Sequence, residues 1–210
     1  MVLLAATACA GTGTATESPN TEPAAVDSPS TEPAADAGRY DSRRFQPPFE
    51  VTVPAWLPLA PSADEQNFLT FIGEDESFDR AVRFLVPVNL YEPGSDTATG
   101  PPDDYVEYLH GQSANGARLT DETTTAVDGM ATTIMTASTS ASLDGSLGCP
   151  AAGVSAPDCF GLQRGMTLRI AVIDMPDATL VAWARVTEGS VDTAEVFADF
   201  EQMLSSLRFR

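Results

Sequence analysis

The absence of large apolar side chains from one long segment constrains this chain more than any other feature. Residues 10–38 contain no Phe, Trp, Tyr, Leu, Ile or Met and consist largely of Thr, Ser, Pro, Ala and Glu. Such a segment cannot bury enough apolar surface to offset the loss of backbone entropy on folding. All aromatic residues except Tyr40 lie after Arg44. We therefore predict a disordered linker over residues 9–44 and a single folded domain over residues 45–210.

The predicted linker also contains an internal repeat. Residues 18–25 (SPNTEPAA) nearly recur as residues 28–35 (SPSTEPAA). The prolines of both copies favour extended polyproline II backbone. We expect this segment to act as a spacer between the domain and its point of attachment.

The charge of the chain excludes nucleic acids as partners. The chain has 11 basic residues, all of them Arg, against 30 Asp and Glu, and its formal net charge is −19. Binding to a nucleic acid depends on cationic contacts to phosphates, which such a chain does not offer. Anionic lipid headgroups also repel such a chain, so it needs a separate anchor if it is to stay at a membrane.

The first nine residues predict such an anchor. Residues 1–8 (MVLLAATA) form an apolar run that ends in small residues, as in a signal peptide, and we interpret them as its remnant. The small residues directly before Cys9 resemble a bacterial lipobox, in which the Cys thiol receives a diacylglyceryl group. Position 6 is Ala where Leu is usual, and no charged segment precedes the run, so we expect the true signal peptide to begin before Met1. We expect a lipid anchor at Cys9 and an extracytoplasmic location, on the outer face of the cell membrane or in the cell wall.

The two remaining cysteines predict a disulfide. Cys149 and Cys159 flank a loop rich in Gly, Pro and Ala. Exported proteins meet an oxidising environment, where a disulfide is the default state of such a pair. A redox CxxC motif is absent from the sequence. Two cysteines without further ligands also make a poor zinc site.

Alternating apolar residues predict an antiparallel sheet. Residues 49–53 alternate as in a half-buried strand. Asp128-Gly129 between two β-rich runs predicts a type I′ hairpin. Further strands are expected over residues 67–72 and 80–91, where Pro87 indicates an edge or a bulge. A second hairpin is expected over residues 166–172 and 179–186.

Two segments predict helices. Residues 102–114 begin with Pro and Asp residues and are followed by Asn115-Gly116, which can supply a left-handed stop. The C-terminal helix is amphipathic, with Ser190 expected as its N-cap. Its apolar face is formed by Val196, Phe197, Phe200, Leu204 and Leu207. We predict an α+β domain, with an antiparallel sheet and helices packed on it.

Three stretches carry a resemblance to a known family. The opening FEVTVPAWLP, the central VDGMAT and the closing DFEQMLSSLRF resemble the PsbP-like superfamily. Actinobacterial cell-wall lipoproteins of the LpqN type are similar, and they share a lipid anchor and a Thr/Pro linker. The resemblance covers about residues 45–210, and it implies a sandwich-like fold with a non-enzymatic accessory or carrier role. It assigns no site residue and no cofactor, and the long loop between the cysteines departs from the family pattern.

The residues that could carry chemistry are few. His110 is the sole histidine, and we expect it to lie partly exposed at a helix end. Acidic clusters occur over residues 74–76 with Asp79 nearby, and at Asp103-Asp104. We interpret them mainly as solvated loops. A calcium site or a pair of catalytic carboxylates stays open as an alternative.

The two tryptophans are expected in the core. Trp183 shares a strand face with Val181 and Arg185, and that face is either covered or a ligand surface. We predict a non-enzymatic domain that binds an apolar envelope molecule, such as a lipid or a glycan, or a membrane protein partner. The alternative is a wall-acting hydrolase that uses paired carboxylates.

Overall fold

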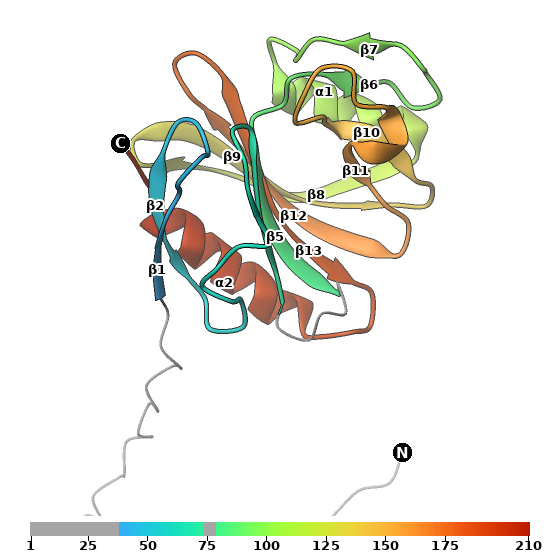
Figure 1. The fold of residues 1–210 in the computed structure, drawn as a ribbon. Coiled ribbons are helices and arrows are strands. Elements are labelled where there is room, and N and C mark those ends of the chain that lie inside the picture. Colours follow the sequence, from blue (N-terminus) through green and yellow to red (C-terminus); the bar gives the residue numbers. More distant parts are fainter. Residues whose placement is uncertain (1–37, 74–78) are drawn as a thin grey trace, which may run out of the picture. The chain divides into compact units, whose positions relative to one another are not determined.

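The structure, a computed structural model, describes residues 38–73 and 79–210. Within these residues a seven-stranded sheet organises the fold, with the strand order β3-β4-β5-β13-β12-β9-β8 (Figure 1). Each neighbouring pair in this sheet is antiparallel. The strands are β3 (Ala63–Asp64), β4 (Phe68–Ile72), β5 (Arg80–Leu85), β8 (Ala117–Val127), β9 (Met130–Thr139), β12 (Met166–Asp174) and β13 (Thr179–Thr187).

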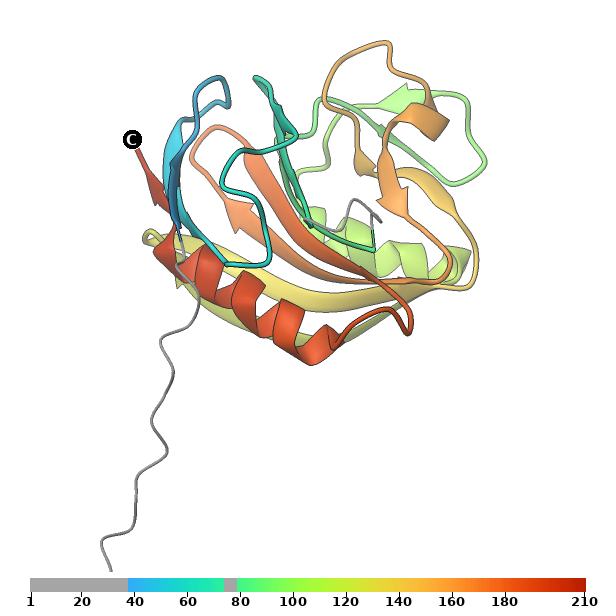
Figure 2. The same cartoon turned by 60° about the horizontal axis from the view of Figure 1, so that its bottom comes forward.

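One face of this sheet, called the first face below, is covered by a helix and a small sheet (Figures 1 and 2). The helix is α2 (Thr193–Ser206), and the small sheet has the order β1-β2-β14. Its strands are β1 (Gly38–Asp41), β2 (Phe49–Val53) and β14 (Arg208–Phe209). Almost fully buried phenylalanines fill the layer between them, namely Phe45, Phe49, Phe71, Phe84 and Phe200.

Helix α2 is amphipathic, as predicted, but it begins later than expected. Its N-cap is Asp192, whose carboxylate accepts hydrogen bonds from the backbone N–H groups of Ala194 (2.9 Å) and Glu195 (3.4 Å). The prediction of Ser190 was wrong: its hydroxyl donates to the Thr187 carbonyl (2.8 Å) instead. An Asp can satisfy the first N–H groups and also places negative charge at the positive end of the helix.

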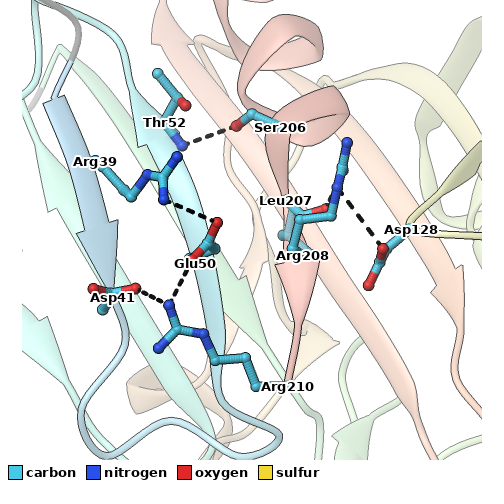
Figure 3. A network of polar contacts seen from close by, with 9 residues as sticks. All are labelled: Arg39, Asp41, Glu50, Thr52, Asp128, Ser206, Leu207, Arg208 and Arg210. Atoms are coloured by element: carbon cyan, nitrogen blue, oxygen red, sulfur yellow. Dashed lines mark hydrogen bonds and ion pairs between the residues drawn. The ribbon is translucent and has the colours of Figure 1, made fainter.

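The two ends of the domain meet on the small sheet (Figure 3). Arg210 donates hydrogen bonds to Asp41 (2.6 Å) and to Glu50 (2.5 Å), which also pairs with Arg39 (3.4 Å). The proximity of Arg210 lowers the pKa of the Glu50 carboxyl. These exposed ion pairs join β1, β2 and the residue after β14, and the charges of both signs in this network largely cancel.

The predicted linker boundary at Arg44 was therefore wrong. Strand β1 pairs with β2 along its whole length, and Tyr40 is buried in the core. The domain thus includes residues 38–44, although this short polar segment carries no alternating apolar pattern. The rest of the predicted linker, the signal peptide remnant and Cys9 lie outside the described residues.

The opposite face, called the second face, is covered by short elements and loops (Figure 1). The hydroxyl of Tyr105 in α1 donates to the Leu147 carbonyl (2.9 Å) and so ties that helix to β10. The covering elements are β6 (Leu90–Tyr91), β7 (Ala98–Thr99), α1 (Tyr105–Gly111), a 3-10 turn (Gln112–Asn115), β10 (Leu143–Gly148), a second 3-10 turn (Ala156–Asp158) and β11 (Phe160–Leu162).

The disulfide holds part of this cover together. Cys149 and Cys159 are bonded, with their Cα atoms 4.6 Å apart, which is the expected pairing. Strand β11 starts immediately after Cys159 and pairs with β10. The two strands approach so closely that a Cβ on Gly161 would lie 2.1 Å from the Leu143 carbonyl oxygen. A glycine is therefore required where the loop returns to the sheet.

Both hairpins and the α+β class are confirmed. Asp128 and Gly129 have φ values of 49° and 81°, as a type I′ turn requires, and β12 and β13 form the second hairpin. The helix predicted over residues 102–114 is shorter: it comprises α1 and the following 3-10 turn, and Gly116 ends it with a φ of 96°.

The strand predicted over residues 80–91 is broken. It leaves the sheet after Leu85. Asn89 then forms an isolated antiparallel bridge with Cys149, and Leu90–Tyr91 pair as β6 with β7. Pro87 lies in the break, because it has no N–H to donate to a neighbouring strand. None of the helices in the described part of the chain is both long and apolar enough to cross a membrane.

Candidate functional site

A small pocket opens on the second face, next to the disulfide. We call it the arginine pocket. Its volume is about 240 Å³. The side chains that matter most for its chemistry are Arg83, Phe160, Met166, Leu168, Trp183 and Arg185.

The register of the sheet brings the two arginines together. Arg83 in β5 lies directly opposite Trp183 in β13, and Arg185 is two residues further along β13. Residues opposite each other, and residues two apart on one strand, project from the same face of a sheet. Both guanidinium groups therefore project from the second face, on either side of the Trp183 position. Trp183 itself is 2% exposed, which confirms it as a core residue.

Arg83 is a cation with few polar contacts. Its Nε atom is fully buried and has no hydrogen-bond partner among the described residues. None of the ion pairs within residues 38–73 and 79–210 includes it. Its guanidinium carbon lies 5.2 Å from the centre of the Phe160 ring, a cation–π contact that replaces little of the lost hydration.

The pKa of Arg83 reflects this environment. Burial lowers it from 12.5 to about 10, and the positive charge of Arg185 lowers it further in the same direction. The group still carries its full charge at neutral pH. The pocket therefore contains a cation that has lost water and has gained no acidic partner within the described residues.

Arg185 completes the positive wall of the pocket. Its Nη1 atom lies 3.8 Å from the sulfur of Met166. Burial lowers the pKa of Arg185, whereas the nearby carboxylate of Asp79 raises it. One of the acidic residues noted in the sequence thus lies close enough to this wall to influence it.

A third buried arginine on the same sheet provides a contrast. Arg169 in β12 projects from the first face, where its Nε lies 2.7 Å from the Glu201 carboxylate of α2. Its Nη1 donates to the Asp121 carbonyl (3.0 Å) and to the Thr136 hydroxyl (3.0 Å). Arg169 thus has an acidic partner and two further acceptors, and it acts as a structural tie between the sheet and α2.

A second hollow, of about 710 Å³, lies where the turn after β1 meets the segment before β3. Its lining includes Arg39, Arg43 and Arg44 and the two carboxylates of Asp41 and Asp64. Asp64 already accepts hydrogen bonds from the Tyr40 hydroxyl and from the backbone N–H groups of Arg43, Arg44 and Phe45. Although burial opposes it, this set of donors holds the Asp64 pKa below 3.8. Asp64 therefore organises the turn.

A third hollow, of about 560 Å³, lies between α2 and the segment after β2. Its aromatic wall is Trp56, whose indole N–H donates to Asp199 of α2 (3.0 Å). The guanidinium of Arg80 lies 5.1 Å from the centre of the Trp56 ring. Trp56 is therefore half-buried and not in the core as expected, and its polar atom is already used within the protein.

The remaining residues singled out in the sequence do not converge on a catalytic arrangement. His110 is partly exposed, as expected, and pairs with Glu122 (2.7 Å). Asp104 caps α1 by accepting a hydrogen bond from the Glu107 N–H (2.9 Å). Residues 74–76 lie outside the described part of the chain, and no cluster of metal-binding side chains occurs within that part.

The sequence reasoning did not single out Arg83 as a site residue. The available signal was a charged residue inside an apolar strand, in RAVRFLV for Arg83 and in VAWARV for Arg185. The pattern places Arg185 and Trp183 on one face, but it does not reveal that β5 lies beside β13. Only the sheet order brings the two arginines into one pocket.

In comparisons with known proteins, no family model and no curated protein matches the chain. A solved structure of cyanobacterial PsbP from Synechocystis is similar, with 13% identity, a TM-score of 0.44 and coverage of 86% of this chain and 98% of that one. The Ran-binding protein Mog1p of Saccharomyces cerevisiae matches with 11% identity, a TM-score of 0.44 and coverage of 83% and 96%.

A protein of Bacteroides thetaiotaomicron is also similar, at 9% identity and a TM-score of 0.40 over 77% of this chain. The match spans 45% of the Bacteroides chain. PsbP, the superfamily that the sequence resembles, is thus among the similar structures.

Proposed function

We propose that this chain is a cell-envelope lipoprotein with a non-enzymatic binding domain, and that the domain captures a negatively charged group in the arginine pocket. The lipid anchor would be attached at Cys9, and the segment up to the domain would act as a spacer. This anchoring rests on the lipobox-like residues before Cys9 and on the composition of the segment that follows.

The observation that carries the binding role is the state of Arg83. A buried charge is costly unless it is paired, and none of the ion pairs among the described residues includes Arg83, although Asp158 lies in the lining of the same pocket. The whole chain has a net charge of −19, so acidic residues are abundant. A cation that has no acidic partner among residues 38–73 and 79–210 favours a ligand that brings negative charge.

The chemistry of the lining favours binding over catalysis. Arginine stays protonated at neutral pH even with a pKa of about 10, so it cannot act there as a general base. The lining also includes Phe160, Met166, Leu168 and Trp183, whose side chains provide apolar contact area. The acidic group in the lining, Asp158, accepts a hydrogen bond from the Ser155 hydroxyl (2.6 Å).

The first experiment tests the anchor. The full chain, with a charged signal-peptide start fused before Met1 and expressed in a bacterial host that lipidates exported proteins, should fractionate with the membrane, and a Cys9→Ser variant of the same protein should move to the soluble fraction. Equal distribution of the two proteins would contradict the anchor.

The second experiment tests the binding domain. Thermal unfolding of the full chain is measured with phosphate, sulfate, succinate or acetate at constant ionic strength. At least one anion should raise the unfolding midpoint of the wild type more than that of Arg83→Gln. The exposed Arg118 offers the matched control, because Arg118→Gln removes one positive charge without touching the pocket. Equal responses of all three proteins to all four anions would contradict the proposal.

A further inference from the structure

We infer that the hollow between α2 and the segment after β2, called the tryptophan groove below, binds a neutral saccharide. The groove measures about 560 Å³. It lies on the first face of the sheet, where α2 runs beside the segment that follows β2 (Figures 1 and 2). The arginine pocket opens on the second face, so this inference concerns a separate site and goes beyond the proposed function.

One wall of the tryptophan groove is an aromatic ring in a fixed orientation. The indole N–H of Trp56 donates to the Asp199 carboxylate (3.0 Å), which ties the ring to α2. The guanidinium of Arg80, the first residue of β5, lies 5.1 Å from the centre of the same ring. The face of an aromatic ring carries partial negative charge and attracts the C–H groups of a sugar ring. Trp56 therefore offers a flat surface on which a sugar can stack.

The opposite wall is a row of polar side chains on α2. Glu195, Asp199 and Gln202 all line the groove, and their spacing of four and three residues places them along one stripe of the helix. None of the ion pairs among the described residues includes Glu195 or Asp199. Within residues 38–73 and 79–210, the side chains of Glu195 and Gln202 form no hydrogen bond. This row offers acceptors, and in Gln202 also a donor, to the hydroxyl groups of a sugar.

One end of the groove is held closed by the protein itself. The Ser206 hydroxyl accepts a hydrogen bond from the Thr52 N–H (2.8 Å), as Figure 3 shows, and donates to the Met203 carbonyl (2.7 Å). Met203 is among the lining residues and is almost fully buried. The two walls are thus joined by contacts within the domain, and a ligand has little order to impose when it binds.

The charges around the groove favour a neutral ligand over an ion. The carboxylates of Glu195 and Asp199 repel an anion. A cation would be attracted by them, but it would also meet the Arg80 guanidinium, which already lies against the Trp56 ring. A neutral sugar meets neither repulsion. Its hydroxyl groups donate to the carboxylates while its C–H groups contact the ring.

The size of the groove sets the length of the ligand. A volume of about 560 Å³ falls within the roughly 300–1,000 Å³ of most sites for small molecules. The lining also includes the apolar residues Pro54 and Ala55 beside Trp56. We therefore expect a disaccharide to fill the groove, with one sugar ring on Trp56.

The test is isothermal calorimetry of the full chain with neutral disaccharides of glucose, mannose, galactose and N-acetylglucosamine. At least one of them should bind the wild type. Trp56→Ala should weaken this binding at least tenfold, because the stacking surface is lost. Gln202→Ala should weaken it at least threefold. The exposed Gln66 lies between β3 and β4 and offers the matched control, so Gln66→Ala should change the affinity less than 1.5-fold.

Two features keep this test decisive if Trp56→Ala is unstable. Gln202 is exposed and its side chain has no hydrogen bond in the described part of the chain, so the fold does not depend on it. The chain has two tryptophans, and Trp183 is 2% exposed. A sugar stacked on Trp56 should therefore change the fluorescence emission of the wild type, and the Gln202→Ala variant should need at least threefold more sugar for the same change.

Charged disaccharides test the preference for a neutral ligand. Deacetylated chitobiose is a cation at mildly acidic pH, and its acetylated form is neutral but otherwise alike. A disaccharide of glucuronate is the anionic counterpart of one of glucose. Each neutral disaccharide that binds should do so at least threefold more tightly than its charged counterpart. Glu195→Gln should reduce this difference for the anion, whereas Glu107→Gln on the exposed side of α1 should leave it unchanged.

The source of the saccharide is distinguished with insoluble polymers. Co-sedimentation of the wild type, but not of Gln202→Ala, with chitin or cellulose would identify a structural polysaccharide. Binding of a disaccharide without co-sedimentation would identify a free saccharide. Either result supports the inference.

Three results would overturn it. The first is that none of the neutral disaccharides binds the wild type. The second is that Trp56→Ala and Gln202→Ala both bind a disaccharide as tightly as the wild type does. The third is that a charged disaccharide binds more tightly than its neutral counterpart. None of these results bears on the arginine pocket, whose anion binding is measured separately.

Discussion

The two faces of the central sheet each bury an arginine, and they surround it in opposite ways. On the first face, Arg169 is enclosed by Glu201, a backbone carbonyl and a hydroxyl. On the second face, Arg83 meets an aromatic ring and a second arginine, with no acidic partner among the described residues. The same residue type in the same sheet is a structural tie in one place, and in the other it lines a pocket without an ion pair among the described residues.

The difference follows from what covers each face. Helix α2 is a regular element, and it places Glu201 opposite the sheet at a fixed position. The cover of the second face is made of short strands and turns held by the disulfide. It supplies Phe160 and Asp158 to the pocket beside Arg83, but none of the ion pairs among the described residues joins Asp158 to Arg83. Buried polar groups that break the rule of pairing are the ones to examine for function.

The largest expected effect comes from the disulfide of the second face. A Cys149→Ser, Cys159→Ser double variant should lose about 3 kcal/mol of unfolding free energy, because the bond closes a loop with a sequence separation of 10. It should also weaken anion binding, because Phe160 directly follows Cys159 in the chain.

Urea unfolding and anion titration measure the two effects of this double variant. The comparison between the faces predicts that hydrogen exchange increases in the cover of the second face, with α2 remaining protected. Equal loss of protection on both faces would show that the disulfide stabilises the whole domain and not this cover.

The second-largest effect on stability is expected at Arg169, on the first face of the sheet. An Arg169→Met variant should lose about 2 kcal/mol, because the Asp121 carbonyl and the Thr136 hydroxyl lose their donor in a buried place. Glu201 is 44% exposed and can turn to water, so the loss should stay below that of a fully buried ion pair. Urea unfolding measures it, with Arg118→Met as the exposed control. A loss below about 0.5 kcal/mol would show that Arg169 is no structural tie.

A third effect concerns the carboxylate that organises the turn after β1. Asp64→Asn should lose about 1.5 kcal/mol at pH 7, because an amide accepts fewer hydrogen bonds than a carboxylate does from the four donors around it.

The stability difference between the wild type and Asp64→Asn should depend on pH, and the pKa of Asp64 sets the direction of this dependence. The folded pKa of Asp64 lies below its ordinary value of 3.8. Its contribution is therefore complete above pH 4 and is lost as the pH falls through the folded pKa. The wild type and Asp64→Asn should converge in stability toward pH 2 to 3, as followed by urea unfolding. A constant difference from pH 7 to pH 2 would contradict this assignment.

The sequence predicted the elements whose patterns are local. The Asp128-Gly129 turn, the hairpin of β12 and β13, the amphipathic face of α2 and the pairing of Cys149 with Cys159 could all be inferred from neighbouring residues. Strand β1 escaped prediction because its four residues pair with a strand beyond the turn and carry no apolar period. The arginine pocket escaped because it depends on β5 lying next to β13, two strands far apart in the sequence.

The smallest effect on stability is expected at Arg83, and it distinguishes the two faces of the sheet most clearly. An Arg83→Met variant keeps most of the side-chain volume and removes a cation that has no acidic partner in the described part of the chain, so its unfolding free energy should stay within about 1 kcal/mol of the wild type or rise. The same substitution at Arg169 is expected to cost about twice as much and to destabilise. In the presence of an anion that the pocket binds, the difference should widen, because a ligand that binds the native wild type adds stability that Arg83→Met cannot gain. Urea unfolding in chloride alone and with the anion that most stabilises the wild type, at equal ionic strength, measures both differences. If Arg83→Met lost 2 kcal/mol or more in chloride alone, Arg83 would be a structural residue like Arg169, and the contrast between the faces would disappear.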